Sequence, residues 1–138
     1  MKIKVIGGIC LLLIALVYSC QSDSSIEFKQ YYSVGSGVYQ AHCQNCHGAK
    51  GDGLAGLIPP LTDTAYLKAN RSALACMLQN GLKKSISVSN RSYDGQMPAS
   101  GLTPMEIAQV ATYVANSFGN KLGVITVDDV GVDLGKCN

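Results

Sequence analysis

The sequence has few of the residues that structural metal sites in proteins usually employ. Its 138 residues include six cysteines but only two histidines, His42 and His47, and a single C-x-x-C pair. A structural zinc site typically takes four cysteine or histidine ligands, usually from two such pairs. The chain therefore does not offer the usual ligand set for zinc. Its glycine-rich stretch also lacks a G-K-[ST] ending and a preceding strand, which argues against a phosphate-binding loop.

A long hydrophobic run is also missing. The apolar segment at residues 5–17 is interrupted only by two glycines, but it is shorter than the roughly 20 residues that cross a bilayer. Lys2 and Lys4 precede it, and a basic start followed by a short apolar core is typical of a secretory signal peptide. An uncleaved membrane anchor is the alternative interpretation.

The end of this segment, LVYSC at residues 16–20, resembles a bacterial lipoprotein signal. In such signals a small residue precedes a cysteine that is lipidated and becomes the new N-terminus. We therefore expect residues 1–19 to be a signal peptide, and lipid on Cys20 to hold the protein at the membrane. Because residues 21–25 are polar, as flexible linkers are, we expect residues 20–32 to form a tether.

The excess of positive charge belongs to the signal. The formal net charge of +2 comes from 11 Lys and Arg against 9 Asp and Glu. Cleavage removes Lys2 and Lys4 and leaves equal numbers of basic and acidic side chains. Without a basic excess, nothing in the mature chain suggests a nucleic-acid partner.

The segment CQNCH at residues 43–47 has the C-x-x-C-H spacing of c-type haem attachment. On a helical turn, residues three and four apart lie on one face, so Cys43, Cys46 and His47 can point the same way. The thiols can add to the vinyl groups of haem, and a neutral imidazole nitrogen can bind the iron. Zinc binding and dithiol chemistry are the alternatives for a bare C-x-x-C pair. His42 would face away, and we expect it to be exposed.

Two prolines, Pro59 and Pro60, follow a glycine-rich loop at residues 48–56. Prolines keep this segment out of a helix and leave its carbonyl groups available. A carbonyl here can accept a hydrogen bond from Nδ1–H of His47. Bonds of this kind orient a metal-bound histidine.

Apolar spacing and capping residues predict several helices. The helices are residues 33–46, a short turn capped by Thr62 or Asp63, residues 71–80 capped by Asn70, and a helix from the N-cap Thr103 to Gly119. The polar residues 82–101 are predicted to form a loop. The tail from residue 120 onwards is rich in β-prone residues near its start, and we make no firm structural prediction for it.

Three methionines follow the C-x-x-C-H motif. Met77 lies at helical spacing with leucines, which favours a place in the core, and Met105 lies off the apolar stripe of its helix. Met97 lies in the polar loop, after an Asp-Gly turn signal and before Pro98, which holds the chain extended. A thioether held in a stiff loop is suited to bind haem iron on the side opposite His47.

Together these residues resemble the class I, single-haem cytochrome c domain over about residues 33–120. The features that carry the resemblance are C-x-x-C-H after a helix with Gly35 and Tyr39, the Pro59 carbonyl that in this family bonds the haem histidine, Met97-Pro98 as the distal methionine, and Val110 and Tyr113 at the crossing with the first helix. The resemblance implies an all-α fold of three to four helices wrapped around one covalently bound haem. The tail at residues 121–138 goes beyond this family pattern, and we expect it to pack on the domain.

The same resemblance implies a one-electron carrier. The haem c would be bound by Cys43, Cys46, His47, Pro59 and Met97, with His47 and Met97 as the iron ligands. Because the sixth position is then filled, we do not expect an enzyme. The expected partners are redox proteins on the periplasmic side: a quinol-oxidising complex, a terminal oxidase or a dehydrogenase. A haem-based ligand sensor and a fixed electron-transfer subunit of a larger oxidoreductase complex are the alternatives.

The remaining cysteines divide by role. Cys10 leaves with the signal and Cys20 carries the lipid. Cys76 and Cys137 are then left as one pair, and in an oxidising compartment we expect them to form a disulfide. Two independent thiols are the alternative.

Overall fold

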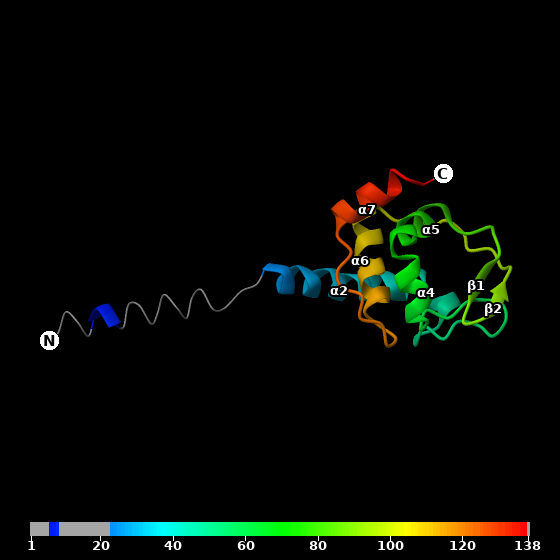
Figure 1. The fold of residues 1–138 in the computed structure, drawn as a ribbon, viewed down its shortest axis with the longest axis horizontal. Helices are drawn as coiled ribbons and strands as arrows, with labels where there is room; N and C mark the ends of the chain where they lie inside the picture. The colour runs from blue at the N-terminus through cyan, green and yellow to red at the C-terminus, as the bar shows by residue number, and fades with distance from the viewer. Residues whose placement is uncertain (1–5, 9–22, 138) are drawn as a thin grey trace.

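The computed structural model describes residues 6–8 and 23–137, and this part of the chain is mostly helical (Figure 1). Residues 6–8 form one helical turn. The elements that follow are α2 (Asp23–His42), α3 (Gln44–His47), α4 (Thr64–Ala69), the 3₁₀ turn η1 (Arg71–Ala73), α5 (Leu74–Asn80), β1 (Ile86–Val88), β2 (Arg91–Tyr93), α6 (Pro104–Ala115) and α7 (Val127–Leu134). No helix in the described ranges has the length and apolarity needed to cross a bilayer.

Helices α2 and α6 cross at the centre of the molecule (Figure 1). Gly35 of α2 lies against the backbone of α6, where a Cβ would collide with the Gln109 carbonyl and lie 3.0 Å from Cβ of Tyr113. Next to this contact, the Tyr39 ring is 1% exposed and lies 5.3 Å from the Tyr113 ring. The predicted crossing at Gly35 and Tyr39 is confirmed. Its physical basis is that glycine allows two helix backbones to approach closely.

Helix α2 begins ten residues earlier than predicted, so a flexible tether over residues 20–32 is wrong for residues 23–32. The helix continues because this part of it packs against the rest of the domain. Tyr31 is buried in the core. The Tyr32 ring lies 5.1 Å from that of Tyr113, and the Ser117 hydroxyl donates to the Tyr32 oxygen at 3.0 Å. Residues 20–22 lie outside the described part of the chain.

The capping residues of α6 and α4 were predicted correctly. Thr103 and Glu106 form a reciprocal capping box with Pro104 in the first turn of α6, and the Asp63 carboxylate accepts from the Tyr66 amide at the start of α4. Asn70, by contrast, makes no side-chain cap, and η1 replaces the first helical turn of the predicted 71–80 helix. Its amide group donates to the Tyr66 carbonyl instead.

Helix α6 ends at Ala115, before the predicted end at Gly119. Phe118 has a φ of 57° and turns the chain back towards the core. There its ring lies 5.3 Å from the Tyr39 ring and meets the Tyr113 ring edge-on at 5.8 Å. Aromatic contacts between distant segments therefore override the local helical pattern.

The loop predicted over residues 82–101 contains a β-hairpin. Strands β1 and β2 pair antiparallel, with Val88 opposite Arg91. The two residues between them, Ser89 and Asn90, have φ angles of 51° and 60°. A two-residue turn with both φ positive matches the right-handed twist of the strands. The all-α prediction is therefore correct in its main content but missed this small sheet.

The tail forms a helix that was not predicted from the sequence. Thr126 and Asp129 form a capping box at the start of α7, and Val130 in its middle is fully buried. Helix α7 contacts α5 and α6 (Figure 1). A disulfide joins Cys76 of α5 to Cys137 just beyond α7. The predicted disulfide is confirmed.

Candidate functional site

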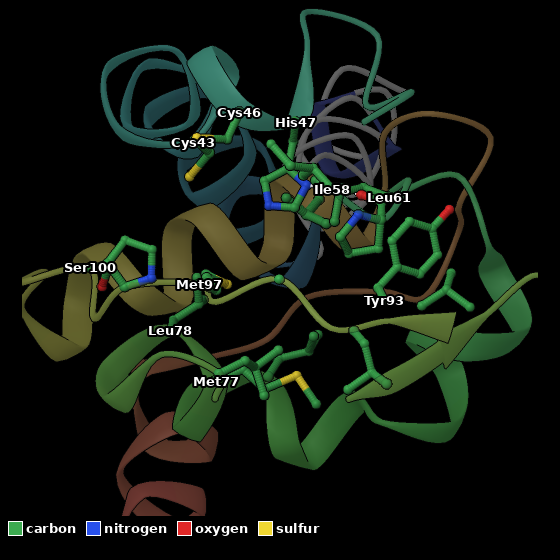
Figure 2. A pocket seen from close by; sticks show the side chains of 18 of the residues that line it. Cys43, Cys46, His47, Ile58, Leu61, Met77, Leu78, Tyr93, Met97 and Ser100 are labelled. Atoms are coloured by element: carbon green, nitrogen blue, oxygen red, sulfur yellow. Dashed lines mark hydrogen bonds between the residues drawn. The ribbon is translucent and has the colours of Figure 1, made fainter. Parts of the chain in front are cut away.

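A cavity of about 290 Å³ lies between the C-x-x-C-H segment and the loops that follow it (Figure 2). Its size is near the lower end of small-molecule pockets, which span about 300–1,000 Å³. Much of its wall is apolar, including Ile58, Leu61, Leu74, Leu78 and Val110. All five residues that the sequence analysis assigned to the cofactor also line it: Cys43, Cys46, His47, Pro59 and Met97.

The two thiols and the imidazole of the motif come from one turn of chain. The amides of Cys46 and His47 both donate to the Cys43 carbonyl, at 3.1 and 2.9 Å. This turn places Cys43, Cys46 and His47 on the same side of the cavity (Figure 2). Both cysteines are free thiols. Burial, and to a smaller extent the neighbouring Cys46, raises the pKa of Cys43 to about 11, so this thiol is protonated at neutral pH.

His47 is held as a neutral imidazole with one nitrogen free. Its Nδ1 lies 3.1 Å from the Pro59 carbonyl oxygen, and we assign the ring proton to Nδ1 because a carbonyl can only accept. Burial lowers the pKa of His47, and the bond to Pro59 offsets this only in part. The other nitrogen, Nε2, therefore keeps its lone pair. The predicted bond between His47 and a proline carbonyl is confirmed.

Hydrogen bonds from the glycine-rich loop hold the Pro59 carbonyl in place. The Gly53 amide donates to the His47 carbonyl at 2.9 Å, and the Leu61 amide donates to the Gly51 carbonyl at 2.7 Å. From the core side, the Tyr39 hydroxyl donates to the Gly48 carbonyl at 2.6 Å. Tyr39 was predicted only to pack in the core, and its bond to the motif was missed. Burial, followed by the charge of Cys43, raises the pKa of Tyr39 to about 12, so it stays a donor.

Two methionines reach the cavity from the side opposite the motif (Figure 2). Met97 is half-buried, and its segment pairs with Leu82: each amide donates to the other carbonyl at 2.9 Å. Met77 of α5 lines the same cavity, whereas Met105 is 42% exposed and does not. The structure therefore removes Met105 as a candidate ligand, and the choice of Met97 over Met77 stays a prediction.

Several polar residues of the cavity were missed from the sequence. Tyr66, Lys84 and Tyr93 line it along with the apolar side chains. The β1–β2 hairpin brings Tyr93 to the wall. The alternation of Ile86 and Val88 with Ser87 was the signal that could have revealed this hairpin. His42 is exposed, as predicted, although it lies at the rim of the cavity.

These features fit a covalently attached haem. The cavity is apolar, two free thiols lie at its edge three residues apart, and a neutral imidazole nitrogen is available beside them. Thioether bonds to the thiols and an Nε2 bond to the iron are the chemistry that this set of donors can supply.

Comparisons with known proteins point to the same prosthetic group. No curated protein matches the chain. The cytochrome c family model, however, matches residues 33–117, which is more than half of the chain and includes the motif and both candidate methionines. The chain belongs to the cytochrome c family, whose members carry covalently bound haem c and transfer electrons through its iron.

Proposed function

We propose that this protein is a single-haem electron carrier, held at the membrane on the periplasmic side by lipid on Cys20. One observation carries the electron-transfer part of the proposal. His47 is neutral, oriented by the Pro59 carbonyl, and flanked by two free thiols at the edge of an apolar cavity.

His47 and Met97, which line the same cavity, are the residues that we propose would hold the iron. A haem held there would supply one-electron chemistry between Fe(II) and Fe(III), and a His/Met ligand pair would favour the reduced state. Two protein ligands leave no position on the iron for a substrate. We therefore propose a carrier rather than an enzyme. The pairing of the Met97 segment with Leu82 supports this, because it holds the chain near the thioether in one place.

The walls of the cavity are proposed to control the electrostatics of the site. Its apolar side chains would keep water away from an iron held beside His47. Tyr66, Tyr93 and Lys84 are the polar side chains on this wall that we expect to meet the carboxylates of haem. Exclusion of water tunes the reduction potential of a metal centre.

The sequence supports membrane attachment on the periplasmic side. The lipoprotein-like segment at residues 16–20 would place lipid on Cys20, and α2 begins only three residues later. The haem domain would therefore lie close to the membrane. Suitable partners are redox proteins at this surface: a quinol-oxidising complex, a terminal oxidase or a dehydrogenase.

The proposal is tested by making the full chain together with haem-maturation machinery. We expect mass spectrometry to show one haem that survives acid–acetone extraction. The absorption spectrum should be that of a six-coordinate iron, with no change on adding carbon monoxide to the reduced protein. A redox titration should fit a single one-electron step. A chain without the haem mass would refute the carrier, and rapid carbon monoxide binding would favour a ligand sensor.

A further inference from the structure

The tail of the chain is connected to the cavity wall although it lies outside the family match. The match ends at residue 117, whereas α7 covers Val127–Leu134 and the disulfide reaches Cys137. Helix α7 is held on the core by its own contacts. Val130 is fully buried, and the Val127 amide donates to the Tyr31 hydroxyl oxygen at 3.3 Å. The tail is thus fixed to the core, and an element that is bonded to the tail is fixed with it.

That neighbouring element is α5, which is too short to be stable alone. It has seven residues, Leu74–Asn80, and isolated helices shorter than about 12 residues are marginal in water. The disulfide joins its third residue, Cys76, to the end of the tail. The residues on either side of it, Leu74, Met77 and Leu78, line the cavity. The bridge therefore anchors the part of α5 that forms the wall.

The end of α5 in turn holds the Met97 segment. The Ser100 amide donates to the Leu78 carbonyl at 3.0 Å, which satisfies one of the unpaired carbonyls at the end of α5. Two further hydrogen bonds join Leu82 and Met97, each of 2.9 Å. At Gly81, with a φ of 73°, a Cβ would collide with the Met97 carbonyl oxygen. The Met97 segment is thus held against the last turn of α5 and the two residues that follow it.

We propose that Cys76 and Cys137 are positioning residues for Met97. The bridge fixes α5 to the α7 tail. The Met97 segment is held by one backbone hydrogen bond to Leu78 of α5 and by two to Leu82, which follows α5 directly after Gly81. The tail thereby sets how readily the Met97 thioether leaves the iron. This inference rests on the proposed function, because it takes Met97 to be the distal ligand.

The test compares the holoprotein with the double variant Cys76→Ser/Cys137→Ser, which leaves no unpaired thiol. Imidazole serves as the probe, because it competes with a thioether for ferric haem. We expect the variant to bind imidazole about tenfold more tightly, since the opened segment releases Met97 more often. Val132→Ala is the matched control, because Val132 is 61% exposed on the same α7 helix. Equal imidazole affinity in all three proteins would overturn the proposal.

Met97→Ala separates a failure of this inference from a failure of the ligand assignment. If Met97 is the ligand, this variant binds imidazole without competition and loses the sulfur-to-iron charge-transfer band. If it keeps the band, the assignment itself is wrong. A lost band together with an unchanged double variant would leave the ligand intact and refute only the role of the bridge.

Hydrogen exchange supplies a second measurement that does not depend on the double variant folding. In the ferrous holoprotein, a phosphine reductant opens the bridge without changing the sequence. We expect the Leu82, Met97 and Ser100 amides to exchange roughly tenfold faster. The Cys43 amide, which donates to the Tyr39 carbonyl in the α2 region, should not change. Unchanged exchange at Met97, or the same acceleration at Cys43 and Met97, would refute the proposal that the disulfide specifically holds the Met97 segment.

Discussion

At the scale of single residues, His47 shows how neighbouring groups prepare one side chain for a metal. Burial keeps the imidazole neutral, and the Pro59 carbonyl accepts a hydrogen bond from its Nδ1–H. The lone pair that remains is on Nε2. Two further hydrogen bonds hold the backbone around His47 in place. The Tyr39 hydroxyl donates to the Gly48 carbonyl, and an amide of the glycine-rich loop donates to the His47 carbonyl.

The choice between two methionines is also a question at this scale. We expect Met97→Ala to abolish the charge-transfer band of the oxidised holoprotein and to lower its reduction potential, because a thioether ligand favours Fe(II). Met77→Ala should keep the band, since its segment is a helix whose side chains pack in the wall. Absorption spectra and redox titrations of both variants check this. Loss of the band in Met77→Ala alone would assign the ligand to Met77.

Asp63 provides a prediction about pH. Its carboxylate accepts from the Tyr66 amide and from the amide and hydroxyl of Ser89, each at 2.9 Å, so it joins α4 to the β-hairpin turn. These bonds, the Tyr66 bond first, lower the pKa of Asp63. A lowered pKa means that the stabilisation is complete above the unfolded value, near pH 4, and is lost as the pH falls through the folded value.

Asp63→Ala should therefore destabilise the protein by about 1 kcal/mol at pH 7, the usual cost of losing a helix cap. The difference from the wild type should shrink in acid below about pH 4. Denaturant unfolding at several pH values measures it. Asp94→Ala, at an exposed position of the same hairpin region, is the control and should change stability by less than about 0.5 kcal/mol. If the difference in stability between Asp63→Ala and the wild type persists at low pH, the role of the ionised Asp63 carboxylate is contradicted.

At the scale of elements, the crossing of α2 and α6 organises the core. Gly35 permits the close approach, and the rings of Tyr32, Tyr39, Tyr113 and Phe118 pack around it. The extension of α2 back to Asp23 adds Tyr31, whose hydroxyl oxygen accepts from the first amide of α7. Helix α2, at the start of the domain, is therefore joined directly to α7, near its end.

Two glycines of α2 offer a matched test of this crossing. Gly35→Ala should destabilise the protein by roughly 1–3 kcal/mol, because the new Cβ meets the Gln109 backbone and overpacks the contact. Gly37→Ala should instead be neutral or stabilising by up to about 1 kcal/mol, since nothing lies within 4 Å of its Cβ and alanine favours a helix. Thermal unfolding of both variants measures the contrast. Equal effects would contradict a tight backbone contact at the crossing.

At the scale of the whole molecule, the cavity lies at the end of α2 that is remote from Asp23. A helix of 20 residues is about 30 Å long. The C-x-x-C-H motif follows α2 directly, so the proposed haem site and the proposed lipid lie near opposite ends of this helix. An anchor at Cys20 would therefore leave the cavity accessible to partners.

Membrane attachment is tested at Cys20. Cys20→Ser should move the protein from the membrane fraction to the soluble periplasmic fraction, or leave it unprocessed with residues 1–19 still attached. Mass spectrometry distinguishes the two products. Ser22→Ala is the control and should stay in the membrane fraction. Membrane association that persists in a correctly cleaved Cys20→Ser variant would rule out a lipid anchor.

The local features of this molecule could be predicted from its sequence because they depend on neighbours along the chain. The spacing of Cys43, Cys46 and His47 is set by one turn of backbone, and the α6 capping box lies within four residues. The Cys76–Cys137 bridge was predictable for a different reason: the other cysteines had assigned roles. The family match over residues 33–117 includes both of these local patterns.

The features that the sequence pattern did not contain depend on burial against distant segments. Helix α2 extends to Asp23 because Tyr31 and Tyr32 reach α6 and the tail. The tail becomes a helix because Val130 finds a place in the core. Met97 was singled out from the sequence, but the backbone hydrogen bonds that hold its segment to Leu78 and Leu82 join residues far apart in the chain and were not. Spacing along a chain specifies one turn, whereas the energy of contacts far apart in sequence depends on the folded shape.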